Sequence, residues 1–151
     1  MGRGSILVVN AGSSSLKFSL FRTDKTAELN LAARGQIDGL GTRPRLSVKD
    51  GSGAALAERD LDFAEARDAK DAVAIAGAWL KGRFAGEPLL AVGHRVVHGG
   101  PEYSRPVLVD EPVLAALERL VPLAPLPRCA TITRPPAIAG AIRGSVAAMY
   151  S

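Results

Sequence analysis

Hydrophobic and polar residues alternate along most of residues 6–60, which is the pattern of half-buried β-strands. An apolar run at Ile6–Val9 leads into a small polar turn, and a second alternating segment follows at Ser15–Phe21. We therefore predict two adjacent antiparallel strands joined by a tight loop. Three more alternating segments predict that the chain continues as an antiparallel meander: Glu28–Ile37, Arg45–Lys49 and Ala54–Asp60.

The spacing of apolar residues changes after this region. Residues recur at helical intervals from Phe63 to Lys81, with Gly82 near the expected C-cap, so we predict a helix there. A short buried strand at Leu89–Val92, an edge strand at Tyr103–Asp110 and a second helix at Glu111–Leu120 follow. The mixture of both periods predicts an α/β fold with a mixed central sheet and flanking helices.

Composition sets limits on function. The chain has 151 residues, of which 47% are hydrophobic and 23% charged, enough for one domain-sized core. Its net charge of +4 comes from dispersed basic residues with 5% aromatics, which argues against a nucleic-acid partner and leaves anionic small molecules. Cys129 is the single cysteine, so neither a disulfide framework nor a cysteine cluster for zinc is expected. Without a secretory or membrane-spanning run, we expect a cytoplasmic protein with no membrane partner.

The first candidate site is the turn between the two predicted N-terminal strands. Gly12 allows a positive φ, and Ser13, Ser14 and Ser15 offer hydroxyls and closely spaced N–H groups, so this loop could wrap an anion while Lys17 supplies positive charge. Asn10, at the end of the first strand, could orient a hydrated divalent cation. An ordinary hairpin turn has the same composition and stays open as the alternative.

The second candidate is the segment GHRVVHGG at residues 93–100. Arg95, near a strand end and a glycine turn, suits a guanidinium that grips a carboxylate or phosphate in a bidentate manner, although a surface arginine is the simpler interpretation. The spacing of His94 and His98 could suggest a metal, but no third ligand lies nearby in sequence. We favour structural histidines that hydrogen-bond the backbone.

Three motifs together resemble a known family. The NAGSSSLKFSL core of Ile6–Phe21, GHRVVHGG, and PLAPL at Pro122–Leu126 are similar, in that order, to the N-terminal part of the acetate kinase family in the acetate and sugar kinase, Hsp70 and actin superfamily. The resemblance covers about residues 5–126. It implies an incomplete N-terminal domain of the actin-like ATPase, or ribonuclease H-like, fold, whose N-terminal β-hairpin carries the phosphate loop.

The resemblance also implies roles for individual residues. Asn10 would help to hold Mg²⁺, residues 12–15 would lie beside the transferring phosphoryl group, and Lys17 would contact the phosphates of ATP or ADP. Arg95 would bind the oxygens of acetate or acetyl phosphate, with Val97 and Leu126 lining the pocket for the methyl group. The implied reaction converts ATP and acetate to ADP and acetyl phosphate by in-line transfer, in a protein that the family suggests is a homodimer.

The chain departs from the family after Leu126. In the family, PLAPL runs on into His-Asn-Pro, whose histidine stabilises the transition state, whereas Pro127 stands at that position here. Residues 127–151 are rich in Arg, Pro, Ala and Gly and contain no acidic residue, so we expect a non-family tail from a frameshift or truncation that is poorly ordered or loosely helical. The C-terminal domain of the family would be absent.

Three functional hypotheses follow from these observations. The first is an acetate kinase by descent that is truncated and inactive as this 151-residue chain. The second is a butyrate or propionate kinase of the same superfamily, which only the volume of the acyl pocket would separate from the first. The third is a noncatalytic fragment or a weak phosphate-binding module.

Overall fold

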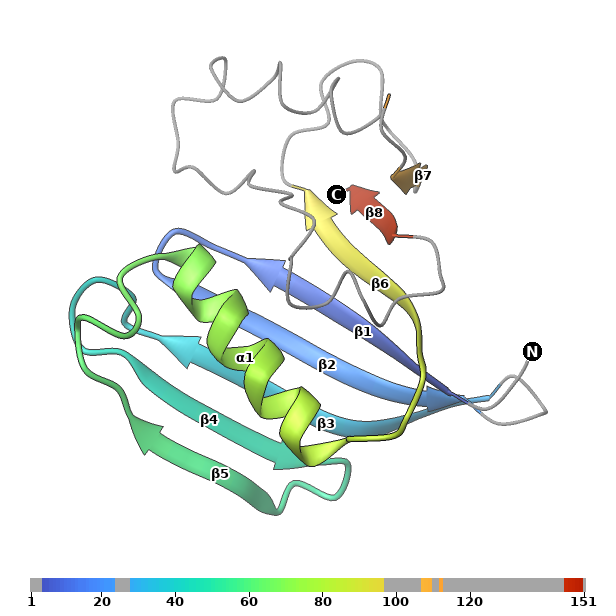
Figure 1. Ribbon diagram of the computed structural model, residues 1–151, viewed down its shortest axis with the longest axis horizontal. Helices are drawn as coiled ribbons and strands as arrows, with labels where there is room; N and C mark the ends of the chain where they lie inside the picture. The colour runs from blue at the N-terminus through green and yellow to red at the C-terminus, as the bar shows by residue number, and fades with distance from the viewer. Residues whose placement is uncertain (1–3, 24–27, 97–106, 110–111, 113–145, 151) are drawn as a thin grey trace.

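One mixed β-sheet with a helix packed on one face makes up the described part of the molecule (Figure 1). The computed structural model describes residues 4–23, 28–96, 107–109, 112 and 146–150. Within them, eight strands lie in the order β5-β4-β3-β2-β1-β6-β8-β7. The elements in chain order are β1 (Gly4–Ala11), β2 (Ser15–Thr23), β3 (Leu29–Asp38), β4 (Arg45–Asp50), β5 (Ala55–Asp60), α1 (Ala69–Arg83), β6 (Leu89–Val96), β7 (Val107–Val109) and β8 (Val146–Tyr150).

Strands β1 to β5 form the antiparallel meander that the alternating pattern predicts. Each strand pairs antiparallel with the next along the chain, and the predicted bounds are correct to within about two residues at nearly every strand end. In the turn between β4 and β5, the backbone N–H groups of Ser52 and Ala54 donate to the Asp50 carboxylate, and Gly53 adopts a φ of 92°. The Asp-Gly-Ser-Gly sequence thus forms a turn because Asp50 accepts hydrogen bonds from backbone N–H groups and Gly53 tolerates a positive φ.

The other half of the sheet brings together distant parts of the chain. Strand β6 lies parallel to β1, β8 lies parallel to β6, and β7 pairs antiparallel with β8 at the sheet edge (Figure 1). The predicted edge strand is confirmed at Val107–Val109, and β6 runs beyond the predicted Val92 to Val96. The expectation of a poorly ordered or helical tail is wrong for Val146–Tyr150, because these residues pair with β6 along their whole length and the first three of them also pair with β7.

Helix α1 begins later than its apolar periodicity predicts. It starts at Ala69 rather than Phe63, because the carboxylate of Asp68 accepts a hydrogen bond from the Asp71 N–H at 3.0 Å and caps the helix. The preceding residues form turns instead, and Phe63 is 58% exposed. The C-terminus also differs, since the helix continues through Gly82 to Arg83 with Phe84 as its C-cap.

The core lies between α1 and the sheet face that the helix covers (Figure 1). Alternate residues of β1 to β4 are buried on this face, and they include the fully buried Leu16, Ile37 and Val48. The helix contributes Ala72, Ala76 and Leu80, which recur every four residues along one face. Alanine at two of these positions lets the helix approach the sheet closely. The α/β fold with a mixed sheet is therefore confirmed.

Several predictions fall on residues outside the described ranges. These are the second helix at Glu111–Leu120, of which Pro112 alone is described, and the predicted features at His98, Val97, Leu126 and Pro127. In the described part of the chain, no helix is both long enough and apolar enough to span a membrane.

Candidate phosphate-binding site

The candidate phosphate loop, residues Gly12–Ser15, leads from β1 into β2 at one end of the sheet and is called the phosphate loop below. Ala11 and Leu16 form the last pair of the hairpin, and the Gly12 N–H donates to the Ser15 carbonyl at 2.7 Å. Ser13 and Ser14 are exposed to solvent. Gly12 does not adopt the positive φ that glycine allows, since its backbone lies outside the left-handed region. A Cβ at Gly12 would lie 3.4 Å from the Ser15 carbonyl oxygen, an ordinary van der Waals contact, so neither its φ nor close packing requires glycine at this position.

Asn10 and Lys17 flank this loop on neighbouring strands. They lie directly opposite each other in the β1–β2 ladder, so their side chains project from the same face of the hairpin. Their neighbours Val9, Leu16 and Phe18 are buried beneath α1, which places Asn10 and Lys17 on the other face. Asn10 is half-buried and Lys17 is exposed. An amide oxygen and an ammonium group thus stand beside the loop.

Arg95 belongs to the strand on the other side of β1. His94 pairs with Val9 in the parallel ladder, so the next residue, Arg95, comes level with Asn10. The backbone therefore carries Asn10, Lys17 and Arg95 to the same end of three adjacent strands. His94 is half-buried and, by register, lies beside Val9 rather than beside Asn10.

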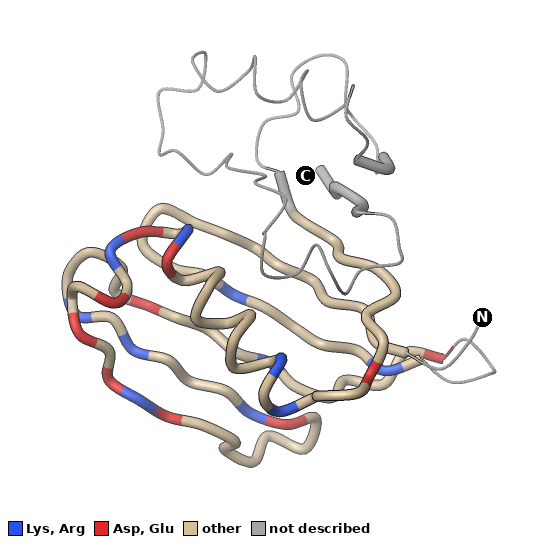
Figure 2. The backbone as a smooth tube through the Cα atoms, viewed as in Figure 1, with Lys and Arg blue, Asp and Glu red and all other residues tan. Residues whose placement is uncertain are grey.

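The ammonium group of Lys17, beside the loop, forms no ion pair within the described residues. The ion pairs there are Arg22–Glu87, Arg45–Glu58, Arg45–Asp60, Arg59–Glu65 and Arg67–Asp71, and none includes Lys17. Figure 2 shows basic and acidic residues interspersed along the outer strands β4 and β5. In this part of the chain, the Lys17 ammonium group keeps its charge available for an anion.

The described residues fit a metal carried by phosphate better than a metal held by protein alone. No group of three His, Cys, Asp or Glu side chains in the described ranges could hold an ion. Asn10 offers one neutral oxygen, and Asp38 lies directly opposite Ser15 in the β2–β3 ladder. Mg²⁺ is usually bound through one or two protein oxygens together with water and substrate phosphates, and this donor set suits that arrangement.

The alternating pattern predicts the Gly39–Gly41 turn, residues 39–41, which directly follows β3, but sequence reasoning missed its contact with the phosphate loop. The Leu40 N–H donates to the Ser14 carbonyl at 3.0 Å and so touches the phosphate loop. Gly39-Leu40-Gly41 is recognisable in the sequence as a turn, but periodicity does not reveal its distant partner. The available signal was Leu40, an apolar residue between two glycines, which indicates that the turn buries a side chain.

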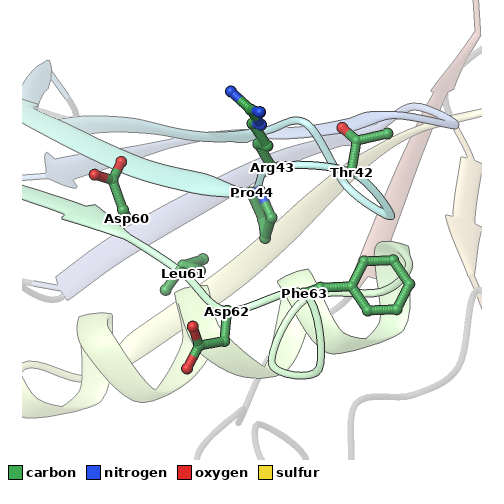
Figure 3. A pocket seen from close by; sticks show the side chains of 7 residues that line it. All are labelled: Thr42, Arg43, Pro44, Asp60, Leu61, Asp62 and Phe63. Atoms are coloured by element: carbon green, nitrogen blue, oxygen red, sulfur yellow. The ribbon is translucent and has the colours of Figure 1, made fainter.

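A separate hollow of about 430 Å³ lies between the β3–β4 turn and the segment that joins β5 to α1 (Figure 3). It is lined by Thr42, Arg43, Pro44, Asp60, Leu61, Asp62 and Phe63. None of the residues predicted to bind substrate contributes to it. The chemistry expected at the phosphate loop and this hollow therefore do not coincide, and we place the candidate site at the loop.

The mixed sheet, which opens with a glycine-serine hairpin and pairs its first strand in parallel with a later one, matches solved acetate and propionate kinases and places the chain in the class of the actin-like ATPase fold. The family model described as the acetokinase family matches residues 5–142, and the chain belongs to this family. The match runs beyond Leu126, and the predicted boundary between a family segment and a different tail stays a prediction.

Curated relatives support the same assignment. The chain is 50% identical over 122 residues to an acetate kinase of Nitrobacter hamburgensis, covering 81% of this chain and 30% of that protein. It is 48% identical over 122 residues to an acetate kinase of Rhizobium meliloti, with the same coverage. The chain thus spans about 30% of the length of these relatives.

Solved structures show the same fold. An acetate kinase from Porphyromonas gingivalis matches 97% of this chain with a TM-score of 0.72 and 28% identity, over 37% of its own length. A propionate kinase from Francisella tularensis matches 97% of this chain with a TM-score of 0.69 and 26% identity, over 36% of its own length.

Proposed function

We propose that this chain supplies the phosphate-loop side of an acetate kinase cleft, in which ATP and acetate are converted to ADP and acetyl phosphate. The observation that carries the proposal is the register that brings Asn10, Lys17 and Arg95 to one end of three adjacent strands. In phosphoryl transfer, catalysis depends on positioning and on charge stabilisation around the equatorial oxygens, and these residues have the required chemistry.

Each residue has a proposed role. Residues 12–15 lie against the transferring phosphoryl group, Lys17 neutralises charge on the nucleotide phosphates, and Asn10 orients the Mg²⁺ ion that the family implies. Arg95 binds the carboxylate of acetate, and Val97 and Leu126 enclose its methyl group. When bound, Mg²⁺ would neutralise charge on the phosphates. Lys17 and Arg95 would hold the two reacting groups in line from the two strands that flank β1.

The role of Arg95 is tested in a chimera that joins residues 1–126 of this chain to the remaining part of the Nitrobacter hamburgensis relative. Arg95→Ala should raise the KM for acetate and lower kcat, and Arg95→Lys should also be damaging because a point charge cannot replace a planar fork. Arg83→Ala, at the far end of α1, is the matched control. Unchanged kinetics in Arg95→Ala would remove Arg95 from the substrate role.

We propose further that the 151-residue chain on its own has no measurable turnover. Transfer needs charge neutralisation from both sides of a closed cleft, and losing one positioned donor costs about a hundredfold or more in rate. The test is hydroxamate formation from acetate and ATP, run beside the chimera. Turnover within about tenfold of the chimera would overturn this proposal, since losses of that size fall below the effect of a single donor.

A propionate kinase is the second candidate, favoured by the structural match to the Francisella tularensis protein. The two activities differ in one methylene of the substrate, which is worth about 10–200-fold in discrimination by an apolar pocket. The ratio of kcat/KM for acetate to that for propionate or butyrate in the chimera decides between them. Weak phosphate binding without catalysis is the third possibility, and the two assays above separate it from the first two.

A further inference from the structure

The phosphate loop is held from outside its own hairpin. The carbonyl of Ser14 accepts a hydrogen bond from the Leu40 N–H at 3.0 Å, although the two residues belong to different turns. Since the peptide group is planar, fixing the Ser14 carbonyl also fixes the plane of the Ser14–Ser15 peptide. The position of Leu40 therefore sets the orientation of one backbone unit of the loop.

The Gly39–Gly41 turn is itself tightly constrained. Gly39 and Gly41 have φ values of 71° and 75°, in the left-handed region that favours glycine. A Cβ on Gly39 would lie 2.3 Å from the Arg43 carbonyl oxygen, which no ordinary contact allows. The N–H and the hydroxyl of Thr42 both donate to the Gly39 carbonyl at 3.0 Å.

The turn is also attached to the rest of the molecule on two sides. The Gly41 N–H donates to the carbonyl of Ala66, in the segment before α1, at 3.2 Å. The Leu40 side chain is 6% exposed and belongs to the core between the sheet and the helix. Leu40 therefore links the phosphate loop to the core, because its N–H donates to the Ser14 carbonyl and its side chain packs in the core.

We propose that the Gly39–Gly41 turn is the positioning element of the phosphate loop, with Leu40 holding the loop in the geometry that binds a phosphoryl group. This inference rests on the proposed function and adds the residues that position its loop without touching the substrate. The two glycines let the backbone present the Leu40 N–H to Ser14 while the Leu40 side chain stays in the core.

The structure offers a matched pair of variants for a test. Gly39→Ala introduces a side chain at a positive φ and against the Arg43 carbonyl. Gly53→Ala introduces the same strain at a φ of 92°, in the β4–β5 turn, where no described atom lies within 4 Å of the added Cβ. Thr42→Val is a milder second variant that removes the hydroxyl bond to Gly39 with little change in volume, in case Gly39→Ala does not fold.

The experiment is a titration of the 151-residue chain with inorganic pyrophosphate and Mg²⁺, followed by the amide resonances of residues 12–17, together with amide hydrogen exchange at Leu40. Gly39→Ala should weaken pyrophosphate binding by about tenfold, as expected for losing one positioned interaction. It should also speed exchange at Leu40 by about tenfold, because local opening becomes easier. Thr42→Val should show smaller changes in the same direction, and Gly53→Ala should change neither quantity.

The possible failures are distinguishable. If the unsubstituted chain does not bind pyrophosphate, the proposed phosphate site is wrong and this inference is wrong with it. If the chain binds and Gly39→Ala weakens binding no more than Gly53→Ala does, the site stands and only the positioning role is overturned. Where Gly39→Ala is unfolded, a Thr42→Val variant that leaves both affinity and Leu40 exchange unchanged likewise overturns the positioning role alone.

Discussion

Gly35 is a position where an added side chain would disturb the core. It lies in β3 opposite Phe18, and a Cβ there would approach the Phe18 ring to 2.3 Å. The ring cannot move freely, because it also packs against Trp79 with a centroid separation of 6.5 Å. Glycine at this position is therefore required by the aromatic side chain across the ladder, not by a turn.

We expect Gly35→Ala to lower the free energy of unfolding by about 1–3 kcal/mol through overpacking. Urea denaturation measures the change. The control is Gly82→Ala in α1, where no described atom lies within 4 Å of the added Cβ, so helix propensity should stabilise the chain by up to about 1 kcal/mol. Similar effects of the two substitutions would show that Phe18 does not restrict this position.

Glu87 makes stability depend on pH at the opposite end of the sheet from the phosphate loop. The Arg22 guanidinium hydrogen-bonds its carboxylate, and the Ser5 hydroxyl donates to it at 3.0 Å. Arg22 also lies over the Phe84 ring at 5.3 Å from the centroid. The hydrogen bonds from Arg22 hold the pKa of Glu87 below its ordinary value of 4.5.

Because the pKa is lowered in the folded state, the carboxylate contributes stability above the ordinary value and loses it as pH falls through the lowered one. Glu87→Gln should therefore cost about 0.5–1 kcal/mol at neutral pH, as partly exposed ion pairs do, and almost nothing in strong acid. Thermal unfolding across this pH range measures the difference. Arg22→Gln should reproduce the trend, and a cost that does not vary with pH would contradict it.

At the level of secondary structure, the sequence predicts features that depend on neighbouring residues and does not predict those that depend on contacts between distant segments. The meander follows from alternation because each strand pairs with its sequence neighbour. The start of α1 does not follow from the spacing of apolar residues. Ala66 fits that spacing, but its carbonyl accepts a hydrogen bond from the Gly41 N–H in another turn. Sequence identifies Asn10, Lys17 and Arg95 as candidates. Neither their common sheet end nor the Leu40–Ser14 hydrogen bond is visible in any local pattern.

The N-cap of α1 gives a prediction at this scale. Asp68→Ala removes the acceptor for the Asp71 N–H and should lower stability by about 1 kcal/mol, with the first turn fraying. Asp68→Asn keeps an acceptor oxygen and should have a much smaller effect. Urea denaturation and helical circular dichroism measure both. Equal losses in the two variants would mean that charge, and not the cap, stabilises this end of the helix.

For the molecule as a whole, β5 is one open edge of the described sheet. Its residues Glu58, Arg59 and Asp60 are exposed, and charged edges resist pairing with other chains. We expect Arg59→Gln combined with Asp60→Asn to increase self-association at high protein concentration, measured by sedimentation. Lys81→Gln with Glu28→Gln changes the charge equally on exposed residues that do not belong to β5. If both pairs self-associate alike, edge protection is not the cause.

Strand β1 has two neighbours that leave the ribosome at very different times. The meander partner β2 follows it at once, whereas β6 emerges only after β3, β4, β5 and α1 have been synthesised. Local pairings form before distant ones, so the apolar strand Gly4–Ala11 spends part of translation with one edge unpaired. The strand that leads into the phosphate loop is therefore a part of the nascent chain that needs chaperone protection until β6 has been made.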